Sequence, residues 1–412
     1  MTNEIPFITY QEMLSSIEGH KNNHLLLGNG FNCSLGICTT YKAIFNQMKI
    51  NNREYESIIG ENFDLEEFIG SCKSKIIKEN NTNYDFMTTF FHNKIKLDFM
   101  KAVTQIVSKD VKNIFKEKNE KIYLLLKNFD NFFTLNYDPF LYQLLMSYKK
   151  EDLKEKKALA FTNTLPFVKE LMQEEDKKLY DIISQAYESG NLTVVIPNNP
   201  KKTNDLNQLK KSEFIQAVNN YLKDKNYTKQ QIKRIVDKIW EQKNEERRKF
   251  IEKLDDGFGL FGDDLVFRHP ETQNLFFLHG AFHIYKRGKS VYKIAQSTEK
   301  ALYQRIEDIV DNHEENILCI FSDKNKISEV QSDEYYLNCF NKLAELEGSL
   351  VVIGCAFSDN DSHIFKQIQN SKINRIYVTC FSSENDKFSK KLRKFFPKKE
   401  LKLVDVETIT YN

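Results

Sequence analysis

Short apolar runs that stop abruptly at glycine or polar residues recur along this chain. The first comprises residues 25–27 (Leu-Leu-Leu) and ends at residues 28–30 (Gly-Asn-Gly). An apolar run before such a turn signal predicts a buried strand. The two glycines allow a tight turn and a close approach of the backbone to a ligand. Farther on, Thr39 and Thr40 precede apolar positions from Tyr41 onward, which predicts an N-cap and a helix.

Strand, glycine turn and helix together form an arrangement that α/β sheets use to hold a phosphate at the positive end of a helix dipole. The full pattern Gly-x-Gly-x-x-Gly is incomplete here, because Cys33 stands where the third glycine would be. A plain structural turn is therefore an equal alternative for residues 28–30.

Further apolar runs predict more strands, and their spacing predicts the fold class. The aromatic run that starts at Asn131 ends in polar residues and Pro139, and this proline suits the first turn of a new helix. The other predicted strands are residues 275–278, 317–321, 349–353, 375–380 and 401–406, with helices at residues 333–346, 361–369 and 387–396. Because strands and helices alternate regularly after residue 315, we predict βαβ units and an α/β fold with a Rossmann-type parallel sheet.

Two helical stretches interrupt this α/β pattern. We predict a core of residues 1–138 and 270–412, in which residues 50–128 form a helical insertion. Residues 139–269 form a second helical insertion. Residues 256–264 are rich in glycine and are predicted to be a loop that ends this insertion, with a lid over the site as a candidate role.

Polar residues or glycine follow five of the predicted strands. In an open parallel sheet, ligands bind beyond the carboxyl ends of the strands, so these residues are the candidate site. The five clusters are residues 28–30, 134–138, 279–280, 354–361 and 379–383. Their number favours a nucleotide-sized crevice over a set of unrelated turns.

Composition and charge narrow the function classes. The 412 residues include 60 Lys and Arg against 58 Asp and Glu, so no overall field attracts nucleic acid or an anionic membrane. No apolar run approaches the roughly 20 residues of a membrane span, and the first residues lack a signal-peptide pattern. The 7 cysteines include no Cys-x-x-Cys pair, which argues against structural zinc and for free thiols in a reducing cytosol. We expect a cytoplasmic protein without a membrane partner.

Local patterns leave some alternatives open and remove others. Residues 201–253 hold fifteen Lys and Arg against eight Asp and Glu, which indicates a solvated helical surface or a basic docking face for a partner or nucleic acid.

Asp359, Asp361 and His363 are metal-ligating types, but Asp near the start of a helix is favoured by the helix dipole, so we predict no metal site. Neither Gly-x-x-x-x-Gly-Lys-Ser/Thr nor Gly-x-Ser-x-Gly occurs, so P-loop and α/β-hydrolase chemistry lack support.

The strand-end motifs together resemble the sirtuin-like family, most closely a bacterial branch of uncharacterised proteins found among antiphage defence genes. The matching stretches are residues 28–32 (Gly-Asn-Gly-Phe-Asn) with Gly36-Ile37, residues 134–138 (Thr-Leu-Asn-Tyr-Asp), residues 279–280 (His-Gly), and Gly354 with Ser358. They are similar to the sirtuin patterns Gly-Ala-Gly-x-Ser with Gly-Ile-Pro, Thr-Gln-Asn-x-Asp, His-Gly and Gly-Thr-Ser, in the same order. The resemblance covers the predicted sheet and neither helical insertion.

The resemblance implies a role for each matching residue. Asn136 would hold the nicotinamide ribose of NAD and position a water, Asp138 would contact the nicotinamide carboxamide, and His279 would be the general base acting through the ribose hydroxyls. Gly28 and Gly30 would approach the pyrophosphate. The implied NAD-binding residues are Gly28, Asn29, Gly30, Phe31, Asn32, Tyr137, Gly354 and Ser358, the last two on the adenosine side.

These residue types suit cleavage of the N-glycosidic bond of NAD. Breaking this bond builds positive charge on the ribose, so the protein mainly has to hold the ribose, admit one water and accept a proton. A neutral histidine suits the last task near pH 7. Two structural alternatives stay open. His279 can be a buried histidine satisfied by backbone groups, and Asn136 with Asp138 can cap the helix that starts at Pro139.

The chain departs from the sirtuin deacylases at several points. No four-cysteine zinc module follows the His-Gly pair, Leu135 replaces the Gln of Thr-Gln-Asn, and Cys38 replaces the proline of Gly-Ile-Pro. Asn29 and Asn32 replace the Ala and Ser of the first pattern. These losses argue against deacylation of acetyl-lysine. Hydrolysis of NAD to nicotinamide and ADP-ribose needs less machinery and fits better.

We therefore expect an NAD glycohydrolase that uses NAD as its substrate without a metal. The resemblance further implies an abortive-infection effector that depletes NAD, a homo-oligomer, and a HerA-like ATPase or another defence partner. Two alternatives stay open. One is a non-catalytic module that senses NAD or ADP-ribose, and the other is a nucleic-acid-processing subunit that uses the basic residues 201–253.

Overall fold

The computed structural model divides the chain into two compact units. The described residues are 5–18, 20–58, 82–154, 174–188, 192, 194–195, 202–203, 211–223, 225, 227–261, 264–294, 299–312, 316–320 and 326–411. The first unit comprises residues 1–144 and 254–412, and the second comprises residues 145–253. The second unit begins later and ends earlier than the insertion predicted at residues 139–269. At the C-terminal end the difference arises because residues 254–269 belong to the first unit and contribute strands to it.

A 7-stranded parallel sheet forms the centre of the first unit. In spatial order its strands are β1 (Phe7–Ile8), β14 (Glu400–Asp405), β13 (Lys372–Cys380), β12 (Glu347–Ile353), β2 (Asn23–Leu27), β3 (Asn131–Thr134) and β8 (Leu275–Phe277). The predicted Rossmann-type α/β fold is confirmed. Without the edge strand β1, the strands numbered along the chain have the order 3-2-1-4-5-6 of dinucleotide-binding folds. The order reverses between β2 and β12, and such sheets bind ligands at this switch point.

The strand β2 lies in the middle of this sheet. Leu25 pairs with Phe132 of β3 on one side and with Val351 of β12 on the other. All residues of β2 are buried. Parallel strands are covered on both faces, which explains why β2 and β12 contain continuous apolar runs instead of alternating patterns.

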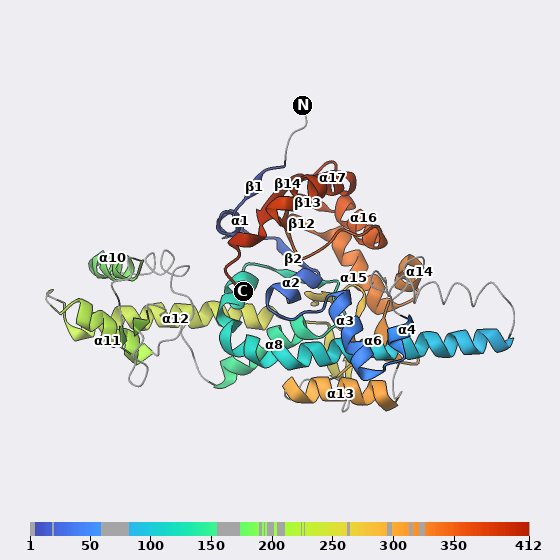
Figure 1. The fold of residues 1–412 in the computed structure, drawn as a ribbon. Coiled ribbons are helices and arrows are strands. Elements are labelled where there is room, and N and C mark those ends of the chain that lie inside the picture. The colour runs from blue at the N-terminus through green and yellow to red at the C-terminus, as the bar shows by residue number, and fades with distance from the viewer. Residues whose placement is uncertain are drawn as a thin grey trace. The chain divides into compact units, whose positions relative to one another are not determined.

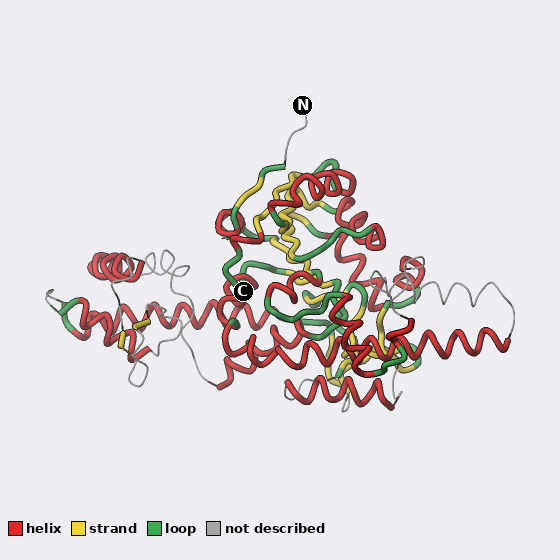
Figure 2. The backbone as a smooth tube through the Cα atoms, in the orientation of Figure 1, coloured by secondary structure: helices red, strands yellow, loops and turns green. Residues whose placement is uncertain are grey.

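Helices of the first unit surround this sheet (Figures 1 and 2). They are α1 (Tyr10–Ile17), α2 (Asn29–Ser34), α3 (Tyr41–Asn51), α4 (Tyr55–Ile58), α6 (Thr82–Glu117), α7 (Asn119–Leu126), α13 (Glu299–Asn312), α14 (Lys326–Gln331), α15 (Glu334–Glu345), α16 (Ser362–Asn370) and α17 (Asn385–Phe395), with 3₁₀ turns η2 (Asp359–Asp361), η3 (Ser382–Glu384) and η4 (Val406–Thr408). The helix α8 (Phe140–Lys154) spans the boundary between the units. The helices predicted at residues 333–346, 361–369 and 387–396 are confirmed as α15, α16 and α17.

The turn after β2 differs from the prediction. Tyr41 does begin a helix, α3, and the Thr40 hydroxyl accepts a hydrogen bond from the backbone N–H of Ala43 as its N-cap. The helix that directly follows the glycine turn is α2, which begins at Asn29 with Gly28 as its N-cap. A helix of 6 residues is too short to produce a recognisable apolar period, so the pattern pointed to α3 instead.

Long helices fill the first predicted insertion. α6 confirms the helical pattern from residue 82 onward, whereas residues 59–81 lie outside the described part of the chain. Phe99 and Val103 of α6 are buried. α6 packs against α3 and α13, and the three helices lie side by side in Figure 1. No helix in the described ranges combines the length and apolar character that a membrane crossing requires.

A second sheet, of 5 antiparallel strands, was not predicted. In spatial order it contains β11 (Asn316–Cys319), β9 (Gly280–Arg287), β10 (Ser290–Lys293), β7 (Asp264–Phe267) and β6 (Phe258–Phe261). The run predicted at residues 317–321 as part of the parallel sheet is β11, which pairs antiparallel with β9 through Ile317 and Tyr285. That part of the prediction is wrong, because an apolar run carries no information on which strand it joins.

The glycine-rich stretch at residues 256–264 contributes to a hairpin and is not the predicted loop, and none of its described residues lines the cavity described below. It contains β6, and Phe258 pairs with Phe267 of β7 across the hairpin. A β-carbon on Gly259 would lie 2.6 Å from the His269 ring, so this glycine allows close packing between the strands. Residues 262 and 263 lie outside the described part.

The described residues of the second unit are mainly helical. It contains α10 (Glu174–Glu188), α11 (Lys211–Tyr221), α12 (Lys229–Lys253) and a hairpin of β4 (Val194–Val195) and β5 (Lys202–Thr203). Its own core includes Tyr180, Phe214 and Ile235, all buried. This unit therefore has an independent apolar core and is more than a surface extension.

Candidate functional site

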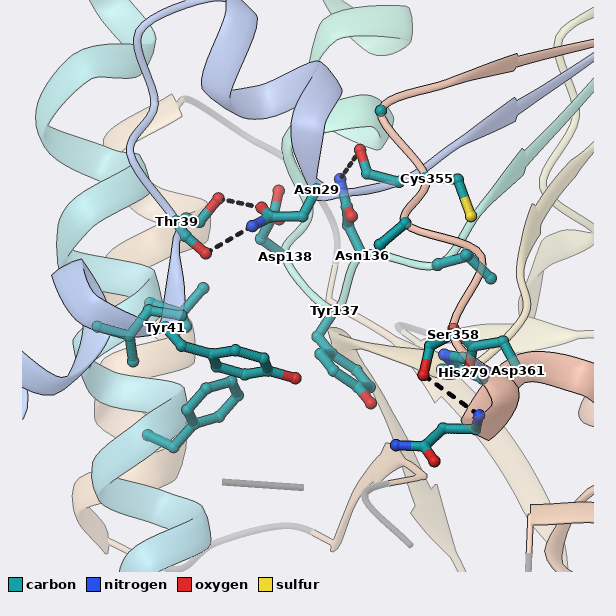
Figure 3. Close-up of a pocket in the computed structure, with 18 residues that line it drawn as sticks. Asn29, Thr39, Tyr41, Asn136, Tyr137, Asp138, His279, Cys355, Ser358 and Asp361 are labelled. Carbon is teal, nitrogen blue, oxygen red and sulfur yellow. Dashed lines mark hydrogen bonds and ion pairs between the residues drawn. The ribbon is translucent and has the colours of Figure 1, made fainter. Parts of the chain in front are cut away.

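A cavity of about 320 Å³ opens at the carboxyl ends of β2, β3, β8 and β12, at the switch point of the parallel sheet (Figure 3). Its lining includes eight of the predicted site residues: Gly28, Asn29, Asn136, Tyr137, Asp138, His279, Gly354 and Ser358. Gly30, Phe31 and Asn32 do not belong to the lining. Four of the five strand-end clusters thus meet at one cavity, although they lie far apart in the sequence.

The fifth cluster, residues 379–383, does not line the cavity. Its first residue, Thr379, is buried and accepts a hydrogen bond from the backbone N–H of Gly354 at 3.1 Å. This cluster therefore supports the loop after β12, and its predicted place in the ligand crevice is not observed.

The glycines after β2 and β12 pack against one another. The N–H of Gly28 donates to the carbonyl of Ile353 and that of Gly30 to the carbonyl of Gly354, both at 2.9 Å. A β-carbon on Gly28 would lie 2.5 Å from the Gly354 oxygen, and one on Gly30 would lie 2.6 Å from the Gly354 α-carbon. Gly354 itself has φ +68°, a left-handed conformation that favours glycine. Contact between two loops thus accounts for these glycines. Gly28 also lines the cavity, and its approach to a ligand stays a prediction.

Asn29 holds the segment that leads to α3. Its amide nitrogen Nδ2 donates to the carbonyl of Thr39 at 2.7 Å, and the Thr39 hydroxyl donates to its Oδ1. Both ends of the amide are therefore engaged by Thr39 (Figure 3). Thr39 also lines the cavity and is not among the predicted site residues.

A chain of hydrogen-bonded polar groups connects α2 with the loop after β3. Nδ2 of Asn136 donates to Oδ1 of Asn32 at 3.2 Å, and Nδ2 of Asn32 donates to Oδ2 of Asp138 at 2.8 Å. The other carboxylate oxygen of Asp138 accepts the N–H of Phe140 at 3.0 Å and so caps α8. Asp138 is thus a helix cap that also lines the cavity, and Asn32 orients two lining residues without lining the cavity itself.

Burial changes the acidity of Asp138. Its side chain is only 4% exposed, and this desolvation raises the pKa of the carboxyl from its ordinary value near 3.8 to about 6. Hydrogen bonds from Phe140 and Asn32 favour the carboxylate but do not offset the desolvation. A substantial protonated fraction exists slightly below neutral pH, and in that form Asp138 can donate a hydrogen bond into the cavity.

His279 lies in the wall of the cavity and is 3% exposed. Its Nε2 is 3.5 Å from Oδ1 of Asp361. The ring stacks on Tyr137 with a centroid distance of 6.0 Å. The following glycine, Gly280, has φ +78°, and a β-carbon there would collide with the carbonyl of Leu318. The His-Gly pair thus places an imidazole at the end of β8 while the glycine makes room for β11.

One wall of the cavity is apolar and comes from α3 and from α6, which belongs to the insertion predicted at residues 50–128. Tyr41 and Ile44 of α3 and Phe99 and Val103 of α6 line it. Tyr137 lies between this wall and the polar groups, and its hydroxyl donates to the carbonyl of Ile320 at 2.9 Å. No sequence signal distinguishes these residues, because an apolar helix position has the same pattern whether it faces a core or a cavity.

The loop after β12 supplies the opposite wall. Ser358 caps η2 by accepting the N–H of Asn360 at 3.2 Å, and Asn360 and Asp361 line the cavity with it. Cys355 also lines the cavity. Burial raises the pKa of its thiol to about 12, so Cys355 is protonated at neutral pH and is a poor nucleophile.

Cations are scarce around the cavity. Its described lining contains the acids Asp138 and Asp361 and neither Lys nor Arg. The ammonium of Lys391 on α17 donates to the carbonyl of Ala356, a lining residue, at 3.2 Å. Among the described residues no group of three or more His, Cys, Asp or Glu is placed to hold a metal ion. The site can therefore supply an imidazole, a carboxyl group, side-chain amides and a flat apolar wall.

A family model described as "Domain of unknown function (DUF4917)" matches residues 235–409. The matched stretch contains β8 and β12 with His279, Gly354 and Asp361, whereas β2 and β3 with Asn136 lie before it. It is less than half of the chain and includes one part of the cavity. No curated protein matches the chain.

Proposed function

We propose that this chain is an NAD glycohydrolase that cleaves NAD to nicotinamide and ADP-ribose. The observation that supports this proposal is the convergence of four separate strand-end motifs on one cavity, at the switch point of a sheet with the strand order of dinucleotide-binding folds. These are the motifs that resemble the sirtuin patterns. The cavity brings Asn136 and His279 into one lining, as the chemistry requires.

The bond to be broken joins nicotinamide to carbon 1′ of the ribose. As it breaks, the ribose becomes an oxocarbenium ion and nicotinamide leaves as a neutral molecule. Water then adds to carbon 1′, and His279 accepts a proton through the ribose hydroxyls. Asn136, held at the cavity by Asn32, would orient the ribose and this water. The aromatic wall around Tyr41 and Phe99 suits a flat base.

The proposal is tested by incubating the full chain with NAD and measuring the nicotinamide released. Release by the parent, and a loss of at least about 100-fold in both His279→Ala and Asn136→Ala with unchanged thermal unfolding, is the expected result. Release that persists in both variants would show that another group performs the chemistry. Cys380→Ala, at a buried cysteine outside the cavity lining, is a control for core truncation.

A second candidate is a module that binds NAD or ADP-ribose and does not cut it. The side-chain amides of Asn29 and Asn136 already form hydrogen bonds with protein groups, so both side chains are held in place without a ligand. This rigidity favours a module that binds the nucleotide without cutting it. Calorimetric binding of NAD without release of nicotinamide would support this candidate over the glycohydrolase.

A nucleic-acid-processing role for residues 201–253 has less support. Arg234 of α12 lies 2.5 Å and Lys238 4.0 Å from the carboxylate of Asp176 on α10, so part of the basic excess is balanced within the second unit. Salt-sensitive DNA binding that is lost on neutralising residues outside these pairs would favour this role.

The biological role follows from the same resemblance. We propose a cytoplasmic antiphage effector that stops phage replication by depleting NAD, acting as a homo-oligomer and triggered by a HerA-like ATPase or another defence partner. Measuring cellular NAD after phage infection, in cells with the parent or with His279→Ala, tests this role. An equal fall in NAD in both strains would contradict it.

A further inference from the structure

The carboxylate of Asp361 lies next to His279 at the cavity. Asp361 is the last residue of η2 and directly precedes α16. Its side chain does not cap α16. Oδ1 instead lies 3.5 Å from Nε2 of His279, and Asp361 lines the cavity beside Ser358 (Figure 3). The carboxylate of Asp361 thus lies beside the imidazole of His279.

His279 is enclosed by groups from several elements. Tyr137 stacks on one part of its ring, and His363 of α16 packs against it with a centroid distance of 5.8 Å. The hydroxyl of Tyr336 on α15 reaches the carbonyl oxygen of His279 at 3.5 Å. Of these described neighbours, Asp361 alone carries a carboxyl group.

We propose that Asp361 is a positioning residue for His279. Its carboxylate orients the imidazole in the cavity wall and stabilises the positive charge that the ring acquires when it takes up a proton. This inference rests on the proposed glycohydrolase function for the identity of the proton donor, a ribose hydroxyl. The pairing of the two side chains is a property of the chain itself and can be measured without any substrate.

The geometry suits this role. The 3.5 Å separation is that of an ion pair, and catalytic contacts in ligand-free sites are often long and tighten when substrate fills the cavity. His279 is 3% exposed, so water screens the pair little and an adjacent carboxylate has a strong effect on the protonated ring. A carboxylate that contacts one ring nitrogen also restricts which of the two nitrogens can face the substrate.

The test compares three variants of the full chain. Asp361→Asn keeps the size and removes the charge, whereas Asp361→Glu keeps the charge. Asp359→Asn is the matched control, because Asp359 belongs to the same 3₁₀ turn but pairs with Lys394 at 2.8 Å on the exposed surface. The pKa of His279 is followed by NMR of the imidazole nitrogens in histidine-labelled protein. Its signal is identified by its loss in His279→Gln.

The expected result is a fall in the His279 titration midpoint of about one pH unit or more in Asp361→Asn, with recovery in Asp361→Glu and no change in Asp359→Asn. An unchanged midpoint in a folded Asp361→Asn variant would overturn the proposal. Where NAD is hydrolysed, the acid limb of kcat/KM should move to lower pH by the same amount. A higher KM with an unmoved pH profile would mean that Asp361 contacts substrate directly, and would also overturn it.

These outcomes separate this inference from the proposed function. If Asp361→Asn lowers the His279 titration midpoint but the parent releases no nicotinamide, the Asp361–His279 pair is supported and the glycohydrolase proposal is contradicted. If the parent releases nicotinamide but Asp361→Asn keeps the parental His279 midpoint and pH profile, the glycohydrolase proposal is supported and the Asp361–His279 pair is contradicted.

Discussion

Gly28 and Gly354 lie so close together that a β-carbon on Gly28 would come within 2.5 Å of the Gly354 carbonyl oxygen. The two residues follow neighbouring strands, β2 and β12, at the point where the strand order reverses. Their contact holds the chain segments after β2 and β12 together at the cavity, which Asn29 and Ser358 also line. A pair of glycines that are more than 300 residues apart in sequence thus shapes the candidate site.

Gly28→Ala is expected to destabilise the protein by about 3 kcal/mol, because the added methyl group meets backbone atoms that cannot move aside easily. The φ of Gly28 is −105°, which alanine adopts without strain, so the cost is steric. Urea unfolding measures it. Gly288→Ala is the control, since Gly288 has φ +59° and nothing within 4 Å of a β-carbon, and should lose only about 1 kcal/mol. Equal losses in the two variants would contradict this account.

Asp138 should make the stability of the protein depend on pH. Its carboxyl has a pKa of about 6 in the folded state and near 3.8 without burial, so the folded protein binds this proton more tightly. The resulting stabilisation is complete below about pH 4 and is lost as the pH rises through 6. Between pH 4.5 and 7.5 the parent should therefore lose about 2 kcal/mol more than Asp138→Asn.

Urea unfolding of both proteins at the two pH values gives this double difference. The comparison cancels the titration of all other groups, provided that Asp138→Asn changes none of them. Identical pH dependence in the parent and the variant would show that Asp138 is not desolvated in solution.

Lys293 and Asp256 form a buried ion pair whose disruption should be costly. Their side chains are 6% and 9% exposed, and the ammonium also lies 4.7 Å from the centre of the Tyr142 ring. Lys293→Met leaves the Asp256 charge buried without its partner, with an expected loss of about 3–5 kcal/mol. Lys289→Met, at an exposed position of the same hairpin, should change stability by less than about 0.5 kcal/mol.

Adding Asp256→Asn to Lys293→Met should recover part of the loss, because no unpaired charge then stays buried. Thermal and urea unfolding of the single and double variants provide the measurement. A double variant less stable than Lys293→Met alone would argue against charge burial as the cause.

The polar residues of the site could be predicted from the sequence, because the carboxyl ends of parallel strands lie at one edge of the sheet. Asn136 and His279 are far apart along the chain, yet each follows an apolar run, and that relation alone was enough to expect them together. The resemblance then suggested what they do. Neither argument could reveal why Gly28 is a glycine, since the neighbouring loop that excludes a β-carbon is brought there by the tertiary fold.

The apolar half of the site could not be predicted for a related reason. Phe99 belongs to a helix whose apolar stripe packs mostly against other helices, and nothing local shows that this residue borders a cavity. The hairpin of β6 and β7 was missed because Gly257 and Gly259 signal a turn, while their use in close strand packing depends on Phe267 and His269. Such partners are visible only after the chain has folded.

Tyr41 provides the clearest test of the apolar wall. Its ring is 41% exposed and stacks on Phe45 with a centroid distance of 6.2 Å, so its removal should affect ligand binding more than folding. Tyr41→Ala should weaken NAD binding about tenfold, the loss expected for one aromatic stacking contact. Calorimetry measures the Kd. Ile50→Ala, at a 75% exposed position of the same helix outside the lining, should leave the Kd unchanged, and equal affinities in both variants would show that the base binds elsewhere.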